Sequence, residues 1–583
     1  MEQLSGAQMV VRALEDEGIN MIFGYPGGTV LDIYDALSFS TKIKHVLVRH
    51  EQAAVHAADG YARSTGRVGV ALVTSGPGAT NCVTGIATAY ADSIPLVVIT
   101  GQVANPLIGQ DAFQEVDTVG ITRPIVKHSF LCKKATDLPV IIKKAFFIAS
   151  TGRPGPVVID IPKDVQNPRV KFDYEYPKEI SMRSYNPTTV GHKGQIKRAV
   201  KLLSESSKPV MYIGGGVVYS NGSECLRKLA KMFNFPVTST LMGLGAYPAE
   251  DPQFLGMLGM HGTYEANMAM HNSDLVLAVG ARFSDRVTNN VQKFCPNAKI
   301  IHIDIDPASI SKTVRVDIPI VGSIDKVIPQ MLDVIDELGI VPNKERVAPW
   351  WDQIAQFRAK KCLDYKKSLD YKKSQYIVPP QVIESLRKCT DENTIIASDV
   401  GQHQMFTALY YPFKKPRKWL NSGGLGTMGY GFPAAIGAQM ANPDETVVCI
   451  SSDGSFQMNI QELSTCMEYG IPLKIVIINN YSLGMVKQWQ KLFYEGRTTA
   501  SYSQQYVNSL PDFVKLAEAY GHVGLRVDKV EELDKTMQNA FAMKDKLVLI
   551  EVLVDPDAKV YPMQIAKGAM CDMRLSDTES TVQ

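Results

Sequence analysis

The chain has 583 residues, which at roughly 150 residues per domain allows three or four domains. Hydrophobic residues make up 45% of it and charged residues 21%, an ordinary globular composition that excludes a disordered chain. The 61 basic and 59 acidic side chains leave a formal net charge of +2, so charge gives no argument for a nucleic acid or an anionic membrane as the main partner.

Segments that would direct the chain to a membrane or out of the cell are not evident. No stretch reaches the roughly 18 apolar residues of a membrane span, and the N-terminus lacks the basic start and long apolar core of a signal peptide. The nine cysteines are scattered and form no Cys-x-x-Cys pair. We therefore expect a reduced, cytoplasmic protein without a structural zinc site.

Predicted strands and helices alternate along the chain. A capping box at Ser5 and Gln8 predicts a helix at the N-terminus. Short β-branched runs, each followed by a helical stretch, lie at residues 68–74, 95–100, 156–160, 209–213, 274–279, 299–304, 394–397, 446–450, 473–478 and 547–552. Because these runs are continuously apolar rather than alternating, they indicate strands covered on both faces.

Two polar gaps divide this pattern. Residues 167–194 and 342–378 read as linkers, and the second contains a tandem repeat at residues 364–375 that we interpret as a duplicated, solvated linker. We predict an α/β protein of three domains, each with a mostly parallel sheet flanked by helices. The domains span residues 1–166, 190–342 and 376–555, and a C-terminal tail covers residues 556–583.

The third domain contains the strongest functional signal. Residues 446–450 run into Ser451-Ser-Asp-Gly-Ser455, and residues 473–478 run into Asn479-Asn480 after one crossover helix. Two parallel strands joined in this way end at the same sheet edge, so Asp453 and Asn480 should share one crevice. Their oxygens suit Mg²⁺, and Gly454 lets the backbone approach a phosphate. Either segment alone would more often be an ordinary turn.

This pair of segments resembles the thiamine-diphosphate motif, usually Gly-Asp-Gly and then Asn-Asn, although Ser452 replaces the first glycine. The resemblance implies that the third domain binds the diphosphate and Mg²⁺, with Asp453, Asn480 and the backbone carbonyl of Ser482 as metal ligands. It also implies further contacts to thiamine diphosphate from Val400, Gly401, Gln402, His403, Gly426, Met428, Gly454, Ser455, Gly484 and Met485. In the family a bulky apolar residue bends the cofactor, and its position corresponds to Met428 in this sequence. Without that resemblance, an isolated Met would be interpreted as a residue that fills the core.

The first domain offers a carboxylate for the same cofactor. Glu51 follows a short strand and opens a helix, where a glutamate near the helix dipole would be the ordinary reading. With the diphosphate motif present, we favour Glu51 as the catalytic carboxylate that contacts the aminopyrimidine ring. The resemblance implies that it reaches the cofactor of a neighbouring subunit, so that the active protein is a homodimer and the first domain binds the pyrimidine.

Longer motifs extend the resemblance over nearly the whole chain. They are Arg49-His-Glu-Gln52, Ser75-Gly-Pro-Gly-Ala-Thr-Asn81, Asp111-Ala-Phe-Gln-Glu115, Gly259-Met-His-Gly262 and Gly484-Met-Val-Lys-Gln-Trp-Gln490. Together they resemble the family of large catalytic subunits of bacterial, FAD-containing acetolactate synthases. The resemblance implies decarboxylation of pyruvate and transfer of the two-carbon unit to a second pyruvate or to 2-oxobutyrate, the first common step of valine, leucine and isoleucine biosynthesis.

The resemblance also assigns residues to the other sites. Catalytic positions beside Glu51 are Gly28, Gln114 and Lys163, and the substrate pocket is formed by Phe113, Met260, Arg286 and Trp489. The central domain would bind FAD through Arg153, Gly214, Gly215, Gly216, His261, Gly280, Arg282, Asp304, Ile305 and Ser323. Ser284 stands where the family usually has Asp, which removes one carboxylate beside the pocket.

Partners and alternatives follow from the same comparison. The family's large subunit works with a small regulatory subunit that confers valine feedback, and this sequence has no spare domain for that task. Related thiamine enzymes, pyruvate oxidase or glyoxylate carboligase, remain alternatives, although Glu51 weighs against the latter. A catalytically silent nucleotide-binding protein is the third alternative, for which Ser452 is the one supporting feature.

Overall fold

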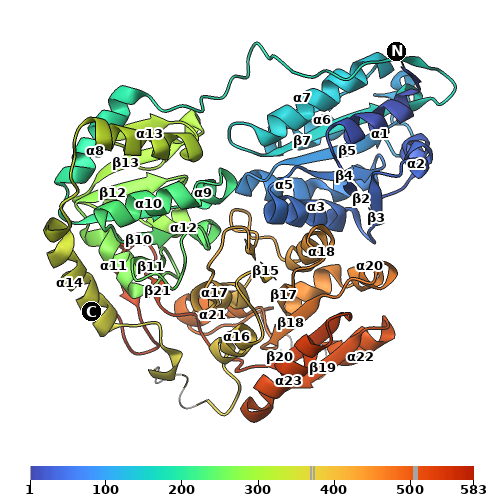
Figure 1. The fold of residues 1–583 in the computed structure, drawn as a ribbon. Coiled ribbons are helices and arrows are strands. Elements are labelled where there is room, and N and C mark those ends of the chain that lie inside the picture. The colour runs from blue at the N-terminus through green and yellow to red at the C-terminus, as the bar shows by residue number, and fades with distance from the viewer. Residues whose placement is uncertain (1, 368–370, 372–373, 503–509, 583) are drawn as a thin grey trace.

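Three parallel six-stranded sheets form the framework of the computed structural model, which describes residues 2–367, 371, 374–502 and 510–582 (Figure 1). This confirms the predicted α/β class with three helix-covered sheets. The N-terminal sheet has the order β3 Lys44–Leu47, β2 Met21–Tyr25, β4 Gly69–Val73, β5 Leu96–Gln102, β7 Pro156–Pro162 and β6 His128–Leu131.

The other two sheets belong to the central and C-terminal parts of the chain. The central sheet has the order β11 Phe254–Met257, β10 Val237–Ser239, β9 Pro209–Ile213, β12 Leu275–Val279, β13 Lys299–Asp304 and β14 Ile318–Val321. The C-terminal sheet has the order β16 Trp419–Leu420, β15 Ile395–Ser398, β17 Val447–Ser452, β18 Lys474–Asn479, β20 Val548–Leu553 and β19 Val523–Val527.

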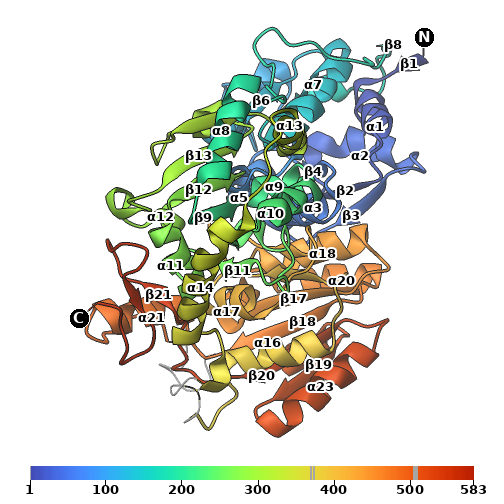
Figure 2. The ribbon, with the colours of Figure 1, turned by 60° about the vertical axis from the view of Figure 1, so that its left-hand side comes forward.

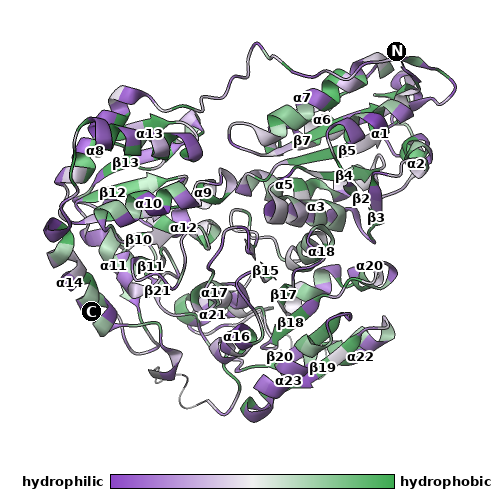
Figure 3. Ribbon diagram, in the orientation of Figure 1, coloured by the Kyte–Doolittle hydropathy of each residue, from purple (hydrophilic) through white to green (hydrophobic). Residues whose placement is uncertain are grey.

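Helices cover both faces of each sheet, with hydrophobic strands inside and polar helix surfaces outside (Figure 3). In the N-terminal part these are α1 Gly6–Asp16, α2 Leu31–Ser38, α3 Glu51–Thr65, α4 Pro77–Asn81, α5 Val83–Asp92, α6 Thr118–Thr122 and α7 Leu138–Ser150. In the central part they are α8 Lys193–Glu205, α9 Gly215–Tyr219, α10 Ser223–Phe233, α11 Tyr264–Asn272, α12 Asp285–Thr288, α13 Ile324–Glu337 and α14 Lys344–Lys360. The C-terminal part has α16 Pro379–Lys388, α17 Gln402–Tyr410, α18 Gly431–Ala441, α19 Asp453–Phe456, α20 Glu462–Tyr469, α21 Gly484–Phe493, α22 Phe513–Ala519 and α23 Val530–Ala542. The capping box at Ser5 and Gln8 opens α1, as predicted.

The prediction of a linker over residues 342–378 is wrong for its first half. Helix α14 occupies residues 344–360, and its Val347, Trp350 and Ile354 are buried against the central domain. The Trp350 indole donates a hydrogen bond to the Pro209 carbonyl (3.0 Å). The spacing of these three residues marks one helix face, but the polar residues around them hide it. The tandem repeat lies partly outside the described residues.

The first predicted linker is largely irregular up to α8 and crosses between the N-terminal and central domains (Figure 1). Its strand β8 Phe172–Tyr174 pairs antiparallel with β1 Glu2–Leu4. The C-terminal tail is ordered, because β21 Met563–Gln564 and β22 Met573–Arg574 pair antiparallel and β21 lies next to α11 in both views (Figures 1 and 2). Within the described part of the chain, no helix is long and apolar enough to cross a membrane.

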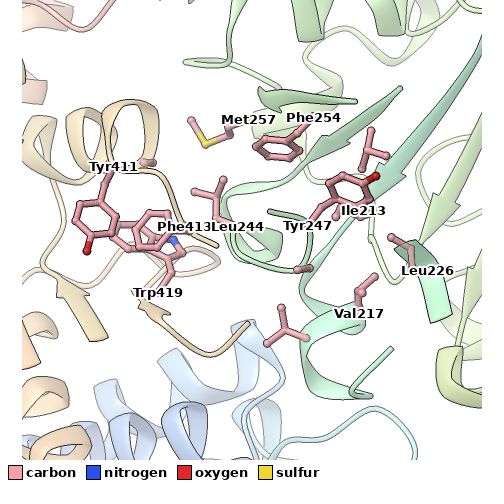
Figure 4. Packing of buried hydrophobic residues seen from close by; sticks show 14 of the residues in the cluster. Ile213, Val217, Leu226, Leu244, Tyr247, Phe254, Met257, Tyr411, Phe413 and Trp419 are labelled. Atoms are coloured by element: carbon pink, nitrogen blue, oxygen red, sulfur yellow. The ribbon is translucent and has the colours of Figure 1, made fainter. Parts of the chain in front are cut away.

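Close packing fixes the domains relative to one another. Aromatic side chains of the C-terminal domain, Phe413 and Trp419, meet Leu244 and Met257 of the central domain in one buried cluster (Figure 4). On the other side, α3 packs against α18. A side chain at Gly437 would overlap the Ala57 carbonyl, so the two helices can approach this closely only because glycine stands there.

Candidate active site

A cavity of about 1510 Å³ lies at the junction of the central and C-terminal domains and reaches the N-terminal domain at α5. It exceeds the roughly 300–1,000 Å³ of a typical pocket for one small ligand. The predicted site residues along its walls are Arg153, Gly214, Gly215, Gly216, Met260, His261, Gly280, Arg282, Arg286, Asp304, Ile305, Ser323, Val400, Gly401, Gln402, His403, Gly426, Met428, Asn480, Ser482, Gly484, Met485 and Trp489. The structure therefore brings the predicted thiamine-diphosphate, FAD and substrate-pocket groups of these two domains into one space.

The predicted metal ligands lie at the carboxyl ends of two adjacent strands. Strands β17 and β18 are parallel with Ser452 opposite Ile478, which places Asp453 and Asn480 next to each other just past the strand ends. The Asp453 side chain is fully buried, and Asn480 Oδ1 accepts the Ser482 amide (3.2 Å). One carboxylate, one amide oxygen and a nearby carbonyl fit a hard cation that keeps further positions for phosphate oxygens.

The replacement of glycine by Ser452 requires no unusual backbone. Ser452 has φ −125° and ψ 171°, extended geometry that any residue adopts. Its hydroxyl lies 3.0 Å from the Ser455 hydroxyl, which in turn donates to the Val400 carbonyl (3.3 Å). The serine is therefore accommodated without strain, and it adds a hydroxyl to the wall of the cavity.

The segment after β15 supplies the other side of the diphosphate region. The side chain of Gln402 accepts a hydrogen bond from Asn480 Nδ2 (3.1 Å) and donates to Gln488 (2.8 Å), so it ties α17 to the metal region. His403 is buried, burial lowers its pKa to about 3, and its Nε2 has no hydrogen-bond partner among the described residues. A buried imidazole nitrogen without a partner, on the wall of a cavity, leaves a polar group that a ligand can contact.

The predicted FAD residues form the opposite end of the cavity. Gly214 and Gly216 pack directly on Gly280, which has φ +58° and whose neighbour Val279 accepts the Gly214 amide (3.0 Å). A side chain at Gly214 or Gly216 would overlap Gly280, so these glycines leave the loop thin beside the cavity. Arg153 pairs with Asp306 (3.4 Å) at the same end. A thin glycine loop with a cationic side chain fits the diphosphate bridge of a dinucleotide.

Three of the four predicted substrate-pocket residues, Met260, Arg286 and Trp489, line the cavity. Trp489 lies on α21, lines the cavity and packs against Phe493 (5.0 Å between ring centroids) rather than in the core. The Arg286 side chain is exposed, contacts Met260 Sδ (3.5 Å) and lies 3.5 Å from its neighbour Asp285. An exposed guanidinium whose one ion-pair contact among the described residues is to its exposed neighbour Asp285 can bind the carboxylate of a small acid.

A second group of predicted residues lies outside the cavity. Gly28, Glu51, Gln114 and Lys163 follow β2, β3, β5 and β7, so they share the carboxyl edge of the N-terminal sheet. Phe113, beside Gln114, is 88% exposed. Asp453, Gly454 and Ser455 lie next to cavity residues, whereas these five are brought together elsewhere.

Glu51 is held by its own domain. Its Oε2 accepts a hydrogen bond from Asn81 Nδ2 (2.9 Å), and a side chain at Gly78 would come within 3.5 Å of its Oε1. Lys163 forms an ion pair with Asp32 (2.8 Å), and Gln114 has φ +61°. This edge therefore presents a fixed carboxylate, an ammonium group and an exposed aromatic ring.

Sequence reasoning missed several residues of the cavity. Tyr212 is fully buried and its hydroxyl has no partner among the described residues, while Asp92 reaches the cavity from the end of α5. Gly423 and Gly424 also line it. The Gly-Gly pair stood in a segment already singled out and could have been found, but nothing in the local sequence marks Asp92 or Tyr212.

Comparison with known proteins agrees with this geometry. Three models of thiamine pyrophosphate enzymes match the chain: the N-terminal TPP binding domain at residues 4–121, the central domain at 196–331 and the C-terminal TPP binding domain at 399–552. Among curated proteins, the acetolactate synthase large subunit of Haemophilus influenzae is 60% identical over 576 residues, 99% of each chain. The isozyme 3 large subunit of Escherichia coli is 59% identical over 583 residues, 100% of each chain. The large subunit of Corynebacterium glutamicum is 48% identical over 573 residues, 98% of this chain and 90% of its own.

The fold, the adjacent strand ends with Asp453 and Asn480, and the three matching models define a thiamine pyrophosphate enzyme. Identity of 56–60% over essentially the whole length to several large subunits narrows this class further. The chain belongs to the family of acetolactate synthase large subunits.

Proposed function

We propose that this protein converts two pyruvates into 2-acetolactate and CO₂, and pyruvate plus 2-oxobutyrate into 2-aceto-2-hydroxybutyrate. One observation supports this most strongly. Most of the predicted thiamine-diphosphate residues, the predicted FAD residues and Trp489 line one cavity, and Asp453 lies next to it, in a chain 59–60% identical to acetolactate synthase large subunits. The product is the precursor of branched-chain amino acids, which gives the enzyme a biosynthetic role.

In this proposal Asp453, Asn480 and the Ser482 carbonyl hold Mg²⁺, which binds the diphosphate of the cofactor. When bound, thiamine diphosphate supplies the carbon nucleophile that attacks pyruvate and the electron sink that permits loss of CO₂. Met428 supports the bent shape of the cofactor, and Gly426 with φ +72° gives the backbone room beside it. Arg153, Gly214–Gly216 and Gly280 hold FAD at the other end of the cavity.

The remaining residues determine which acids react. Arg286 binds the carboxylate of the acceptor acid through its exposed guanidinium. Trp489 packs against the extra methyl group of 2-oxobutyrate, a contact worth about 1–3 kcal/mol in such pockets. Glu51 holds and moves a proton at the aminopyrimidine ring. Because Glu51 lies outside the cavity of its own chain, it serves the cavity of a second copy, so the active species is a homodimer.

The protein also works with a separate regulatory subunit in this proposal. Its relatives are called large subunits, and the three matched domains are those of thiamine pyrophosphate enzymes, two of them described as TPP binding. Feedback by valine would then depend on the small partner. Full valine-sensitive activity of this chain by itself would contradict that arrangement.

The test is product analysis. Purified protein supplied with thiamine diphosphate, Mg²⁺, FAD and pyruvate should form acetolactate, and added 2-oxobutyrate should divert product to 2-aceto-2-hydroxybutyrate. Oxygen consumption with acetyl phosphate or acetate as product would instead indicate an oxidase, and tartronate semialdehyde from glyoxylate would indicate a carboligase. Calorimetry without any thiamine diphosphate binding would indicate a silent binding protein.

A further inference from the structure

The loop of residues 421–430 contains the two residues that would meet the thiamine ring system, Gly426 and Met428. It connects β16 with α18 and has glycine at positions 423, 424, 426 and 429, of which Gly426 and Gly429 have φ +72° and +87°. Glycine-rich segments have many conformations available, and this one has few side chains of its own to restrict them. Its shape must therefore be imposed by its neighbours.

The end of this loop is held by its own domain. The buried carboxylate of Asp399 accepts hydrogen bonds from the Gly429 amide (2.8 Å) and the Gly431 amide (3.2 Å). Asn459 donates to the Gly429 carbonyl (2.6 Å). These contacts fix the segment after Met428. At the start of the loop, Gln404 of the same domain donates to Asn421 Oδ1 (3.2 Å) and to the Ser422 carbonyl (3.5 Å), and the amides of Gly423 and Gly424 that follow are held from another domain.

The beginning of the loop is held from the N-terminal domain. Asp92, the last residue of α5, accepts hydrogen bonds from the amides of Gly423 (3.1 Å) and Gly424 (2.7 Å). One turn earlier on α5, the Thr88 hydroxyl lies 2.7 Å from the Thr427 hydroxyl. A side chain at Gly424 would come within 2.7 Å of Asp92 Oδ1, so the contact depends on glycine there.

Arg63 fixes the direction of the Asp92 carboxylate. Its guanidinium donates to Asp92 (2.9 Å) and to Asp59 (2.5 Å), and all three side chains are buried. Asp59 in turn accepts the Tyr430 hydroxyl (2.6 Å). Two carboxylates share one cation here, and the surplus negative charge is met by the loop amides and this hydroxyl.

We propose that Asp92, oriented by Arg63, is a positioning residue that sets the conformation of residues 421–428 for binding thiamine diphosphate. In this role the Asp92 carboxylate does not contact the cofactor. It holds the glycine-rich segment, before the cofactor binds, in the conformation that forms a wall of the site. Preorganisation of this kind lowers the entropy lost on binding. The inference rests on the proposed function, because it assumes that Gly426 and Met428 contact the cofactor.

The test compares Asp92→Asn with Asp59→Asn in the full-length protein. An asparagine at position 92 offers one oxygen for two loop amides and turns its NH₂ group toward the other. An asparagine at position 59 can still accept Tyr430 and the Arg63 Nε, and Asp59 contacts neither glycine amide. Both variants disturb the same buried cluster, so they should lower the unfolding temperature by similar amounts.

Calorimetric titration of the apoprotein with thiamine diphosphate at saturating Mg²⁺ separates positioning from stability. We expect the dissociation constant to rise about tenfold in Asp92→Asn, equivalent to about 1.4 kcal/mol, and less than about threefold in Asp59→Asn. Amide exchange of residues 421–428 in the apoprotein should quicken in the first variant alone. Equal changes in both variants would show that the cluster acts only through stability.

A second variant covers the case in which Asp92→Asn does not fold. Thr88→Val removes the hydroxyl contact to Thr427 without changing charge. It should weaken binding about threefold and lower the unfolding temperature less than loss of a buried carboxylate does. Wild-type affinity in Asp92→Asn, or in Thr88→Val where Asp92→Asn does not fold, would overturn the inference. If the wild-type protein itself does not bind thiamine diphosphate, the proposed function fails instead.

Discussion

The two groups of site residues differ in how fully residues of the same chain enclose them. We call the group that lines the cavity, together with Asp453 beside it, the enclosed half, and the group at the carboxyl edge of the N-terminal sheet the open half. The group in the cavity is enclosed by the central and C-terminal domains and rests on buried polar contacts such as Gln402 with Asn480 (3.1 Å). The group at the edge of the N-terminal sheet is ordered but open, and its Phe113 is 88% exposed. The difference is what the homodimer proposal requires, since there the exposed group meets a second copy of the chain.

The N-terminal domain also carries exposed apolar side chains close in sequence to the residues of the open edge. Tyr25, Leu31, Leu107 and Phe113 belong to the N-terminal domain, and each is at least 39% exposed. Apolar side chains gathered near a functional carboxylate are typical of a surface that another molecule covers. Under the homodimer proposal, that molecule is the cavity side of a second copy.

The largest expected effect, a loss of both cofactor binding and activity, comes from a substitution in the enclosed half. Asp453→Ala removes the one buried carboxylate among the proposed metal ligands, so Mg²⁺-dependent binding of thiamine diphosphate should be lost and activity should fall at least about a hundredfold. Titration of the apoprotein with thiamine diphosphate at several Mg²⁺ concentrations measures this. Asp453→Asn, which keeps one oxygen, should retain intermediate affinity, and wild-type affinity in both variants would remove Asp453 from the metal site.

Glu51→Gln tests the open half. The amide keeps the hydrogen-bonding shape beside Asn81 but cannot take up or release a proton, so turnover should fall by about 10²–10⁴. Affinity for thiamine diphosphate should change far less, because the diphosphate and metal contacts belong to the enclosed half. Steady-state kinetics and calorimetry together check this split.

Mixing Glu51→Gln with Asp453→Ala tests whether the two halves of one site come from different chains. If Glu51 serves a second copy, a dimer of one Glu51→Gln chain and one Asp453→Ala chain has one intact site, and random mixing should restore about a quarter of the wild-type activity. Each variant incubated alone is the control. Mixtures as inactive as the separate variants would show that Glu51 and Asp453 of the same chain form a site.

The enclosed half could be predicted from the sequence because its signals are local. Parallel strands deliver their ends to one edge, so the runs at 446–450 and 473–478 were sufficient to place Asp453 beside Asn480. Helix α14 was missed because its buried face is only three residues in a polar segment. The contact of Asp92 with Gly424 joins residues 332 positions apart, and no local pattern encodes a pairing of that length.

A smaller effect, on the choice of acceptor acid, is expected from a substitution in the proposed substrate pocket. Trp489→Leu shortens the cavity wall on α21 and should lower the preference for 2-oxobutyrate over pyruvate as acceptor by about tenfold. Competition between the two acids, followed by product analysis, measures the ratio directly. Phe493→Leu, which changes the ring packed against Trp489, is the matched control and should alter the ratio less.

The smallest expected effect is on stability, and it concerns the buried residues that hold the loop of the open half. The loop that carries Phe113 and Gln114 is fastened by Gln102, which donates to the Val116 carbonyl (2.8 Å) and to Asp160 (2.9 Å). Burial raises the pKa of Asp160 to about 7, against hydrogen bonds from Thr100 and Gln102 that lower it. The folded protein therefore binds this proton more tightly than the unfolded chain.

The sign of the pH dependence follows from linkage. The contribution of Asp160 to stability is fully present below about pH 4 and is lost as the pH rises to about 7, at most about 1.4 kcal/mol per pH unit. Asp160→Asn does not titrate, so its unfolding temperature should lie furthest below that of the wild type at pH 5 and approach it by pH 8. A difference for Asp160→Asn that stays constant with pH would contradict this prediction, because it would mean that the carboxyl keeps one protonation state across the range.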